Sequence, residues 1–267
     1  MFALLAMVPM LQIQPEEVVY SRVAGLELHL DVYRPAPSPK PTPAMVLVHG
    51  GGWIAGDWRG MGWLADMFVP KGVLCASVEY RFRDKFKWPA QLDDVQTAVR
   101  FLRSHAKDYN IDPNRIGAVG DSAGGHLAQC LGVYETHDPH PAEYPGLSSR
   151  AKAVWNIYGP IDFTYIISDE VRNMGKDLAQ GETDAQLREP SPYFFASRKS
   201  APTFFIQGKN DPLVSWQQAQ HMSDKLQSLH VETNLNLIDG MGHGLDLGNP
   251  KQAEVAHRAV DWILAHL

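Results

Sequence analysis

Short strand-like runs alternate with longer stretches of helical periodicity from residue 44 to the C-terminus. Each run has four to six residues, is rich in apolar side chains and ends before a glycine or a polar residue: residues 45–48, 73–78, 115–119, 153–158, 203–207 and 233–238. The last helical stretch, residues 251–266, repeats its apolar positions every three or four residues, as a helix with one buried face does. This alternation predicts an α/β fold with a mainly parallel central sheet and helices on both faces.

Two regions depart from the alternation. Residues 18–33 read as two strands around Gly25, which predicts an N-terminal β-hairpin. Residues 159–200 contain a polar helical stretch and a proline-containing turn, which predicts a small lid over the site. The alternative is a surface segment that does not contact substrate. No repeat, low-complexity tract or charge run marks a boundary, so we expect residues 1–267 to form a single domain.

The strongest chemical motif is Gly-Asp-Ser-Ala-Gly-Gly at residues 120–125, where Ser122 stands between a predicted strand and a predicted helix. A serine at the apex of such a turn is typical of the nucleophile elbow of acyl-transfer enzymes. Glycines two residues before and after the serine leave room for a very tight turn. The motif predicts a nucleophilic Ser122, although an ordinary strand-to-helix connection has a similar composition.

A second motif, His-Gly-Gly-Gly-Trp at residues 49–53, directly follows the predicted strand at residues 45–48. Consecutive glycines let backbone N–H groups approach a ligand without intervening side chains. We expect the N–H groups of Gly51 and Gly52 to join that of Ala123 in an oxyanion hole. His49 is expected to hold this loop by hydrogen bonding rather than to take part in catalysis.

A nucleophilic serine needs a histidine base and a carboxylate that orients the base, and in this order of motifs both follow downstream strands. Asp211 lies in the loop after the strand at residues 203–207 and is the acid candidate, with Asp239 and Asp246 as rivals. His243 is the base candidate. Among the eleven histidines it alone lies between glycines, in a loop after a strand and beyond Asp211.

With these motifs together, the chain resembles the α/β-hydrolase superfamily, and within it the esterases with a His-Gly-Gly-Gly oxyanion motif. Residues 88–102, 109–116 and 120–127 are similar to bacterial carbohydrate esterases related to bifunctional acetyl-xylan and feruloyl esterases. The resemblance implies an α/β-hydrolase fold and a serine carboxylic-ester hydrolase with the triad Ser122, Asp211 and His243 and no cofactor. The implied substrates are acetyl or feruloyl esters of plant carbohydrates, or similar small esters, on which general carboxylesterases also act.

Three other functions are weighed against this one. An arylformamidase is the nearest, because residues 49–53 also fit the His-Gly-Gly-x-Trp pattern of kynurenine formamidases. A peptidase related to prolyl oligopeptidases ranks lower, because such enzymes carry a propeller domain that selects peptides and no propeller is expected from this sequence. A non-catalytic binding protein on a hydrolase fold typically lacks a triad member, whereas all three candidates are present here.

Several tryptophans are candidates for binding a sugar or a feruloyl ring. Trp53 follows the oxyanion glycines, Trp88 precedes a predicted helix and Trp216 follows Asp211. All three positions are compatible with the rim of the site, while ordinary packing is the alternative and the favoured one for Trp88 and Trp216.

Composition narrows the choice of partners. A formal charge of −6 without a basic stripe disfavours nucleic acid, and we expect no membrane span. Cys75 and Cys130 are expected to be small buried residues rather than a disulfide, and no cluster of cysteine and histidine has metal-ligand spacing. The expected partner is therefore a small-molecule or carbohydrate ester.

The N-terminal segment allows three interpretations. Residues 1–11 are almost wholly apolar, like the core of a secretory signal, but lack positive leading residues and an obvious cleavage site. Residues 1–14 are thus either a signal remnant, the product of an incorrectly assigned start, or a segment packed on the fold. The first would imply a secreted or periplasmic protein, the others a cytoplasmic one.

Overall fold

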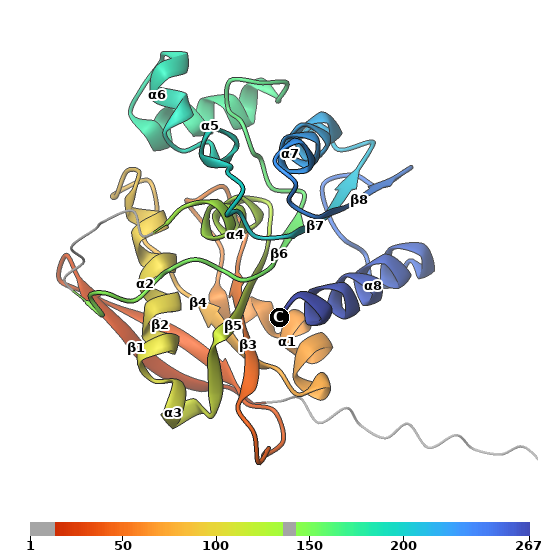
Figure 1. Cartoon of the computed structure of the whole chain (residues 1–267). Coiled ribbons are helices and arrows are strands. Elements are labelled where there is room, and N and C mark those ends of the chain that lie inside the picture. Colours follow the sequence, from red (N-terminus) through yellow and green to blue (C-terminus); the bar gives the residue numbers. More distant parts are fainter. Residues whose placement is uncertain (1–13, 136–142) are drawn as a thin grey trace, which may run out of the picture.

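The computed structural model describes residues 14–135 and 143–267, so the apolar segment at residues 1–11 lies outside the described residues (Figure 1). An eight-stranded sheet has the order β1-β2-β4-β3-β5-β6-β7-β8. Its strands are β1 (Glu16–Val23), β2 (Leu26–Tyr33), β3 (Thr42–Val48), β4 (Leu74–Val78), β5 (Ile111–Asp121), β6 (Val154–Ile157), β7 (Thr203–Gly208) and β8 (Thr233–Ile238). β1 and β2 form the predicted hairpin, and β2 runs antiparallel to β4. The remaining pairings are parallel, which confirms the mainly parallel sheet.

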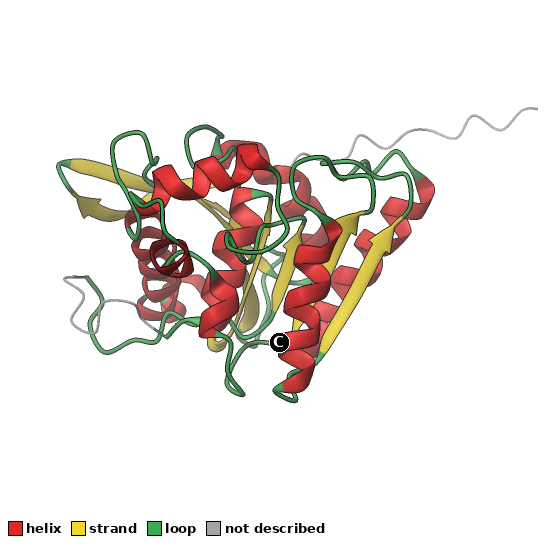
Figure 2. Ribbon diagram, turned by 90° about the horizontal axis from the view of Figure 1, so that it is seen from above, coloured by secondary structure: helices red, strands yellow, loops and turns green. Residues whose placement is uncertain are grey.

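Helices cover both faces of this sheet (Figure 2). One face packs against α2 (Ala90–Ser104), α4 (Ala123–Val133) and α7 (Trp216–Ser228). The other packs against α1 (Gly62–Phe68) and α8 (Pro250–His266). Three short helices lie between β3 and β5 in the chain: η1 (Trp58–Met61), η2 (Val69–Lys71) and α3 (Ala106–Tyr109). The chain therefore has the predicted α/β architecture.

The two-sided cover explains the continuous apolar run of β3. Val46 and Val48 point into the cluster beneath α2 and α4, while Met45 and Leu47 point into the cluster beneath α1 and α8. Successive side chains of a strand lie on opposite faces, so a strand buried on both sides has no polar position to alternate with. These four side chains are fully buried.

The segment between β6 and β7 carries α5 (Asp169–Ala179), α6 (Asp184–Arg188) and η3 (Pro192–Phe195). We call residues 159–200 the insertion. Its helices lie beyond the carboxyl ends of the parallel strands, at the top of Figure 1. This edge is where open α/β sheets bind their ligands.

The structure also bears on the two cysteines and on the possibility of a membrane-spanning helix. Cys75 in β4 and Cys130 in α4 are both buried and free, as predicted. No helix within residues 14–135 and 143–267 has the length and apolar character needed to cross a bilayer.

Candidate active site

Ser122 occupies a strained turn between β5 and α4. Its backbone lies at φ 50° and ψ −119°, a region that residues with a Cβ rarely adopt. A Cβ added to Gly124 would lie 2.0 Å from the carbonyl oxygen of Val48, and one added to Gly120 would lie 2.4 Å from that of Gly124. The packing of β3, β5 and α4 thus excludes any side chain at the two glycines, for the reason expected from the motif.

The structure brings the three candidate residues into one hydrogen-bonded series. His243 Nε2 lies 2.8 Å from Ser122 Oγ, and His243 Nδ1 lies 2.7 Å from Asp211 Oδ2. The ring of Tyr158, the residue directly after β6, packs on His243 with 4.7 Å between centroids. If Nδ1 donates its proton to Asp211, Nε2 is free to accept the proton of Ser122, which is the tautomer that a general base requires.

Asp211 has surroundings that keep it ionised. Its side chain is fully buried, which by itself would raise the pKa of this carboxyl. The hydrogen bonds from His243 and from the N–H groups of Val214 and Leu213 outweigh burial and hold the pKa below its usual value. Gln207 of β7 adds a further donor, 3.0 Å from Oδ2. Asp211 is therefore an anion that can orient His243 and stabilise its protonated form.

Residues 49–53, which we call the glycine loop, face Ser122 across a cavity. Gly51 and Gly52 have φ values of 110° and 60°, and both line the cavity that also contains Ser122. As the first residue of α4, Ala123 has a backbone N–H without a partner inside its helix. The three expected oxyanion donors thus belong to two segments that converge at Ser122.

Asp121 links these two segments, a role that we did not anticipate. Its Oδ1 accepts a hydrogen bond of 3.0 Å from the N–H of Gly50. Burial raises the pKa of Asp121, and the Gly50 N–H acts in the opposite direction. The variable position before the serine of the motif thereby ties the elbow to the glycine loop.

His49 has the supporting role expected from the sequence. Its Nδ1 lies 2.7 Å from the carbonyl oxygen of Gly50, and its ring stacks on Tyr80 with 4.3 Å between centroids. Burial lowers the pKa of His49, which keeps the imidazole neutral near pH 7. His49 does not line the cavity at Ser122.

The cavity at Ser122 has a volume of about 300 Å³ and largely apolar walls. Val171 and Met174 of α5 form part of its wall, so the insertion borders the site and is not a surface segment remote from it. Pro160, Leu213 and Val214 add further apolar surface. This composition suits a small uncharged group placed beside Ser122.

The three candidate tryptophans lie in different surroundings. Trp53 lines the cavity, but only 1% of its surface is exposed and its Nε1–H donates to His126 Nδ1 at 3.2 Å. Trp88 packs on His126 and Tyr134, with ring centroids 5.6 and 6.5 Å apart, and does not line the cavity. Trp216 begins α7 and is likewise absent from the lining. The packing of Trp88 agrees with the alternative favoured for it, and a contact of any of the three tryptophans with substrate stays a prediction.

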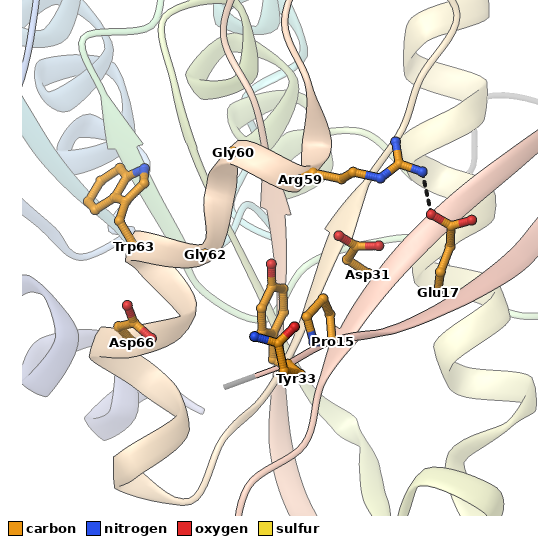
Figure 3. A pocket seen from close by; sticks show the side chains of 10 residues that line it. Pro15, Glu17, Asp31, Tyr33, Arg59, Gly60, Gly62, Trp63 and Asp66 are labelled. Atoms are coloured by element: carbon orange, nitrogen blue, oxygen red, sulfur yellow. Dashed lines mark hydrogen bonds and ion pairs between the residues drawn. The ribbon is translucent and has the colours of Figure 1, made fainter. Parts of the chain in front are cut away.

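A larger cavity, of about 660 Å³, lies between the β1–β2 hairpin and the segment from η1 to α1 (Figure 3). Its lining includes Glu17, Asp31, Tyr33, Trp63 and Asp66. Burial, with the nearby carboxylates, raises the pKa of Tyr33 to about 12. None of the triad candidates lines this cavity.

Within the described residues, no group of three or more His, Cys, Asp or Glu side chains is placed to hold a metal ion.

Comparison with known proteins identifies the family. A model of the BD-FAE family matches residues 30–226, most of the chain. The chain belongs to the BD-FAE family. Among curated relatives of this family member, esterase LipC of Mycobacterium tuberculosis is 30% identical, over 82% of this chain and 57% of LipC. Esterase LipQ of the same organism is 28% identical, over 88% of this chain and 58% of LipQ. The chain thus spans little more than half the length of these relatives.

Solved structures share the fold of this BD-FAE family member over nearly its whole length. A thermophilic esterase from Thermogutta terrifontis, with butyrate bound, superposes with a TM-score of 0.81 at 23% identity and covers 94% of each chain. An acetyl ester-xyloside bifunctional hydrolase from Caldicellulosiruptor lactoaceticus superposes with a TM-score of 0.81 at 24% identity, covering 96% of this chain and 98% of its own. These matches confirm the α/β-hydrolase fold.

Proposed function

We propose that this protein is a serine carboxylic-ester hydrolase that works through an acyl-enzyme. The observation that carries the proposal is the series Asp211–His243–Ser122, with its two short hydrogen bonds, at the wall of an apolar cavity. Membership of the BD-FAE family and similarity to relatives named esterases support the same activity.

In the proposed mechanism, His243 takes the proton of Ser122 as Oγ attacks the ester carbonyl carbon. The N–H groups of Gly51, Gly52 and Ala123 stabilise the oxyanion, and Asp211 stabilises the imidazolium. The carbon–oxygen bond to the alcohol breaks as His243 gives its proton to the departing oxygen. Water then attacks the acyl-enzyme while His243 takes its proton, the bond between the acyl carbon and Ser122 Oγ breaks, and His243 returns the proton to Oγ as the acid leaves.

We further propose acetyl or feruloyl esters of plant carbohydrates, or similar small esters, as substrates. A cavity of about 300 Å³ with apolar walls has room for a short acyl group. One structural neighbour is described as an acetyl ester-xyloside bifunctional hydrolase and another as a carbohydrate esterase from gut microbiota, which supports an ester-bearing sugar as the alcohol.

The proposal is tested by acetate release from acetylated xylan, with p-nitrophenyl acetate and methyl ferulate measured beside it. We expect Ser122→Ala to lower kcat by something on the order of 10⁴ to 10⁶, while circular dichroism stays unchanged. Ser228→Ala, at an exposed serine whose hydroxyl donates to the backbone carbonyl of Lys225 in its own helix, is the matched control. Near-normal turnover in Ser122→Ala would exclude it as the nucleophile.

The same assay separates the substrate classes. Serine-dependent release from the polymer supports a carbohydrate esterase. Activity confined to the two small esters indicates a general carboxylesterase, and faster turnover of N-formylkynurenine than of either ester indicates an arylformamidase.

A further inference from the structure

The glycine loop holds a backbone conformation that needs support from outside. Gly52 and Trp53 are consecutive residues with φ values of 60° and 59°, both in the left-handed region. Glycine adopts this region freely, but the Cβ of Trp53 disfavours it. The position of the oxyanion N–H groups therefore depends on contacts that stabilise this part of the loop.

Arg83, in the segment after β4, provides two such contacts. Its Nε donates to the carbonyl oxygen of Gly52 at 2.9 Å, and its backbone N–H donates to that of Trp53 at 2.7 Å. Two successive peptide groups of the loop are thus held by one residue. The Arg83 side chain is 11% exposed, so water competes little for these carbonyl groups.

The other end of the Arg83 guanidinium reaches the insertion. Its Nη1 forms an ion pair with Asp177 of α5, and Lys87 Nζ lies 2.7 Å from the second oxygen of the same carboxylate. The hydrogen bond from Lys87, with the charges of both neighbours, lowers the pKa of Asp177. One helical turn earlier, Met174 Sδ lies 3.3 Å from where a Cβ on Gly52 would stand. Arg83 thus joins the glycine loop to the helix that walls the cavity.

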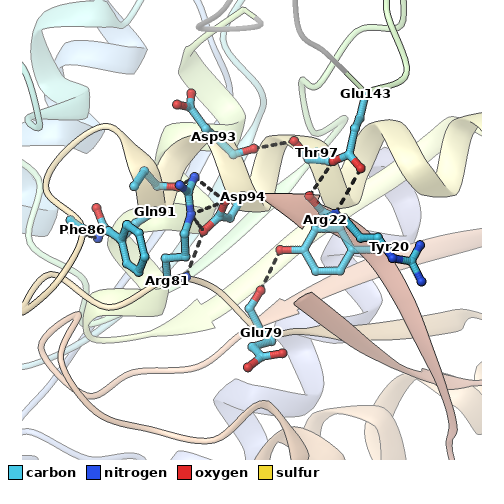
Figure 4. A network of polar contacts seen from close by, with 12 residues as sticks. Tyr20, Arg22, Glu79, Arg81, Phe86, Gln91, Asp93, Asp94, Thr97 and Glu143 are labelled. Atoms are coloured by element: carbon cyan, nitrogen blue, oxygen red, sulfur yellow. Dashed lines mark hydrogen bonds and ion pairs between the residues drawn. The ribbon is translucent and has the colours of Figure 1, made fainter. Parts of the chain in front are cut away.

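The backbone that carries Arg83 is itself anchored. Two residues earlier, Arg81 donates from its guanidinium and its backbone N–H to the buried carboxylate of Asp94 in α2, at 2.7 to 3.0 Å (Figure 4). Tyr80 donates from its hydroxyl to the carbonyl oxygen of His49 at 3.0 Å. The side chain of Arg83 therefore extends from a fixed point.

We infer that Arg83 is a positioning residue, which holds the N–H groups of Gly51 and Gly52 toward the oxyanion and holds α5 against the same loop. The inference rests on the proposed esterase function and deepens it. Arg83 lies outside the cavity lining and acts through the loop. Its removal should therefore weaken binding of the tetrahedral intermediate more than binding of the substrate.

The test compares Arg83→Met with Arg103→Met. Arg103 also donates to main-chain carbonyl oxygens, those of Pro113, Ser148 and Arg150, none of which lines the cavity. We expect Arg83→Met to lower kcat for p-nitrophenyl acetate by about 10- to 100-fold with KM within about twofold, somewhat less than the loss of a direct oxyanion donor. Arg103→Met should lower Tm but leave kcat within about twofold.

Phenylboronic acid supplies a second readout, because it forms a tetrahedral adduct with a nucleophilic serine. Its Ki should rise in Arg83→Met by the factor by which kcat/KM falls. Arg83→Lys, which keeps the charge and one donor, should show a smaller loss and serves if Arg83→Met does not fold. An unchanged kcat and Ki, or an equal loss of kcat in Arg103→Met, would overturn the positioning role.

Wild type and Ser122→Ala are measured first with the same ester. A wild type without serine-dependent turnover contradicts the proposed function itself. Normal wild-type turnover with an undiminished Arg83→Met contradicts only the inference about Arg83.

Discussion

Side-chain surroundings separate the three candidate acids. Asp211 is buried and receives hydrogen bonds from His243, Gln207 and two backbone N–H groups. Asp239 is 74% exposed and pairs with Lys209 at 2.9 Å. Asp246 accepts from the N–H of Gly248 in its own turn. A carboxylate must contact Nδ1 of the base to select its tautomer, and of the three only Asp211 does so.

Asp211→Asn should lower kcat by something on the order of 10⁴, because an amide at this position does not select the tautomer in which Nε2 accepts the proton of Ser122. The measurement is steady-state hydrolysis of p-nitrophenyl acetate between pH 6 and 9. Asp239→Asn is the matched control and should retain wild-type kcat. Equal losses in the two variants would remove Asp211 from the acid role.

At the level of elements, the site depends on how closely β3 approaches the start of α4. The 2.0 Å between a Cβ on Gly124 and the carbonyl oxygen of Val48 is a clash with backbone, which cannot move aside as a side chain can. The same approach brings the glycine loop after β3 beside Ser122. The glycine therefore serves both the packing of these elements and the geometry of the site.

Gly124→Ala should lower the free energy of unfolding by about 2 kcal/mol or more, since the added methyl group forces β3 and α4 apart. Gly60→Ala, at an exposed glycine of η1 with nothing within 4 Å of the added Cβ, should change it by less than about 0.5 kcal/mol. Urea denaturation followed by tryptophan fluorescence measures both. Similar effects in the two variants would contradict the tight approach of β3 and α4.

For the molecule as a whole, His126 joins three separate parts of the chain. Its Nδ1 accepts from Trp53 in the glycine loop, and its Nε2 must then carry the proton that it donates to the carbonyl oxygen of Pro190 in the insertion. The residue itself belongs to α4, one turn after Ser122. Burial lowers the pKa of His126 to about 4, so the folded protein contains the neutral ring.

This burial predicts a loss of global stability in acid. Below the ordinary histidine pKa of about 6.5, the unfolded chain binds a proton that the folded chain excludes until about pH 4. The contribution is therefore complete above pH 6.5 and is lost as the pH falls, by about 3 kcal/mol at pH 4. His126→Gln should be less stable at pH 7 but should lose less stability between pH 7 and 4.5.

Urea denaturation across this pH range tests the prediction. His257→Gln, at an exposed position of α8, should keep the wild-type pH dependence. A wild-type slope in His126→Gln would show that the acid sensitivity arises elsewhere.

Much of this protein could be predicted from local patterns. Strand and helix periodicities depend on residues close together in the chain, so the sequence predicts β3 to β8 and the hairpin in outline. The roles proposed for Ser122, Asp211 and His243 came from motif order, and the structure brings all three side chains together. The tryptophans could not be assigned from sequence alone, because a large aromatic side chain suits a core as well as a rim. The single domain and the catalytic roles stay predictions.

What the sequence determined by itself was the set of elements and the residue types available for chemistry, because backbone preferences and turn glycines act over short stretches of chain. Only the tertiary structure decided which distant groups meet. Asp121 holds Gly50 across 71 positions, Arg83 holds Gly52 across 31, and His126 meets Pro190 across 64. These contacts depend on sheet order and on the placement of the insertion above it, and no local pattern of residues specifies either.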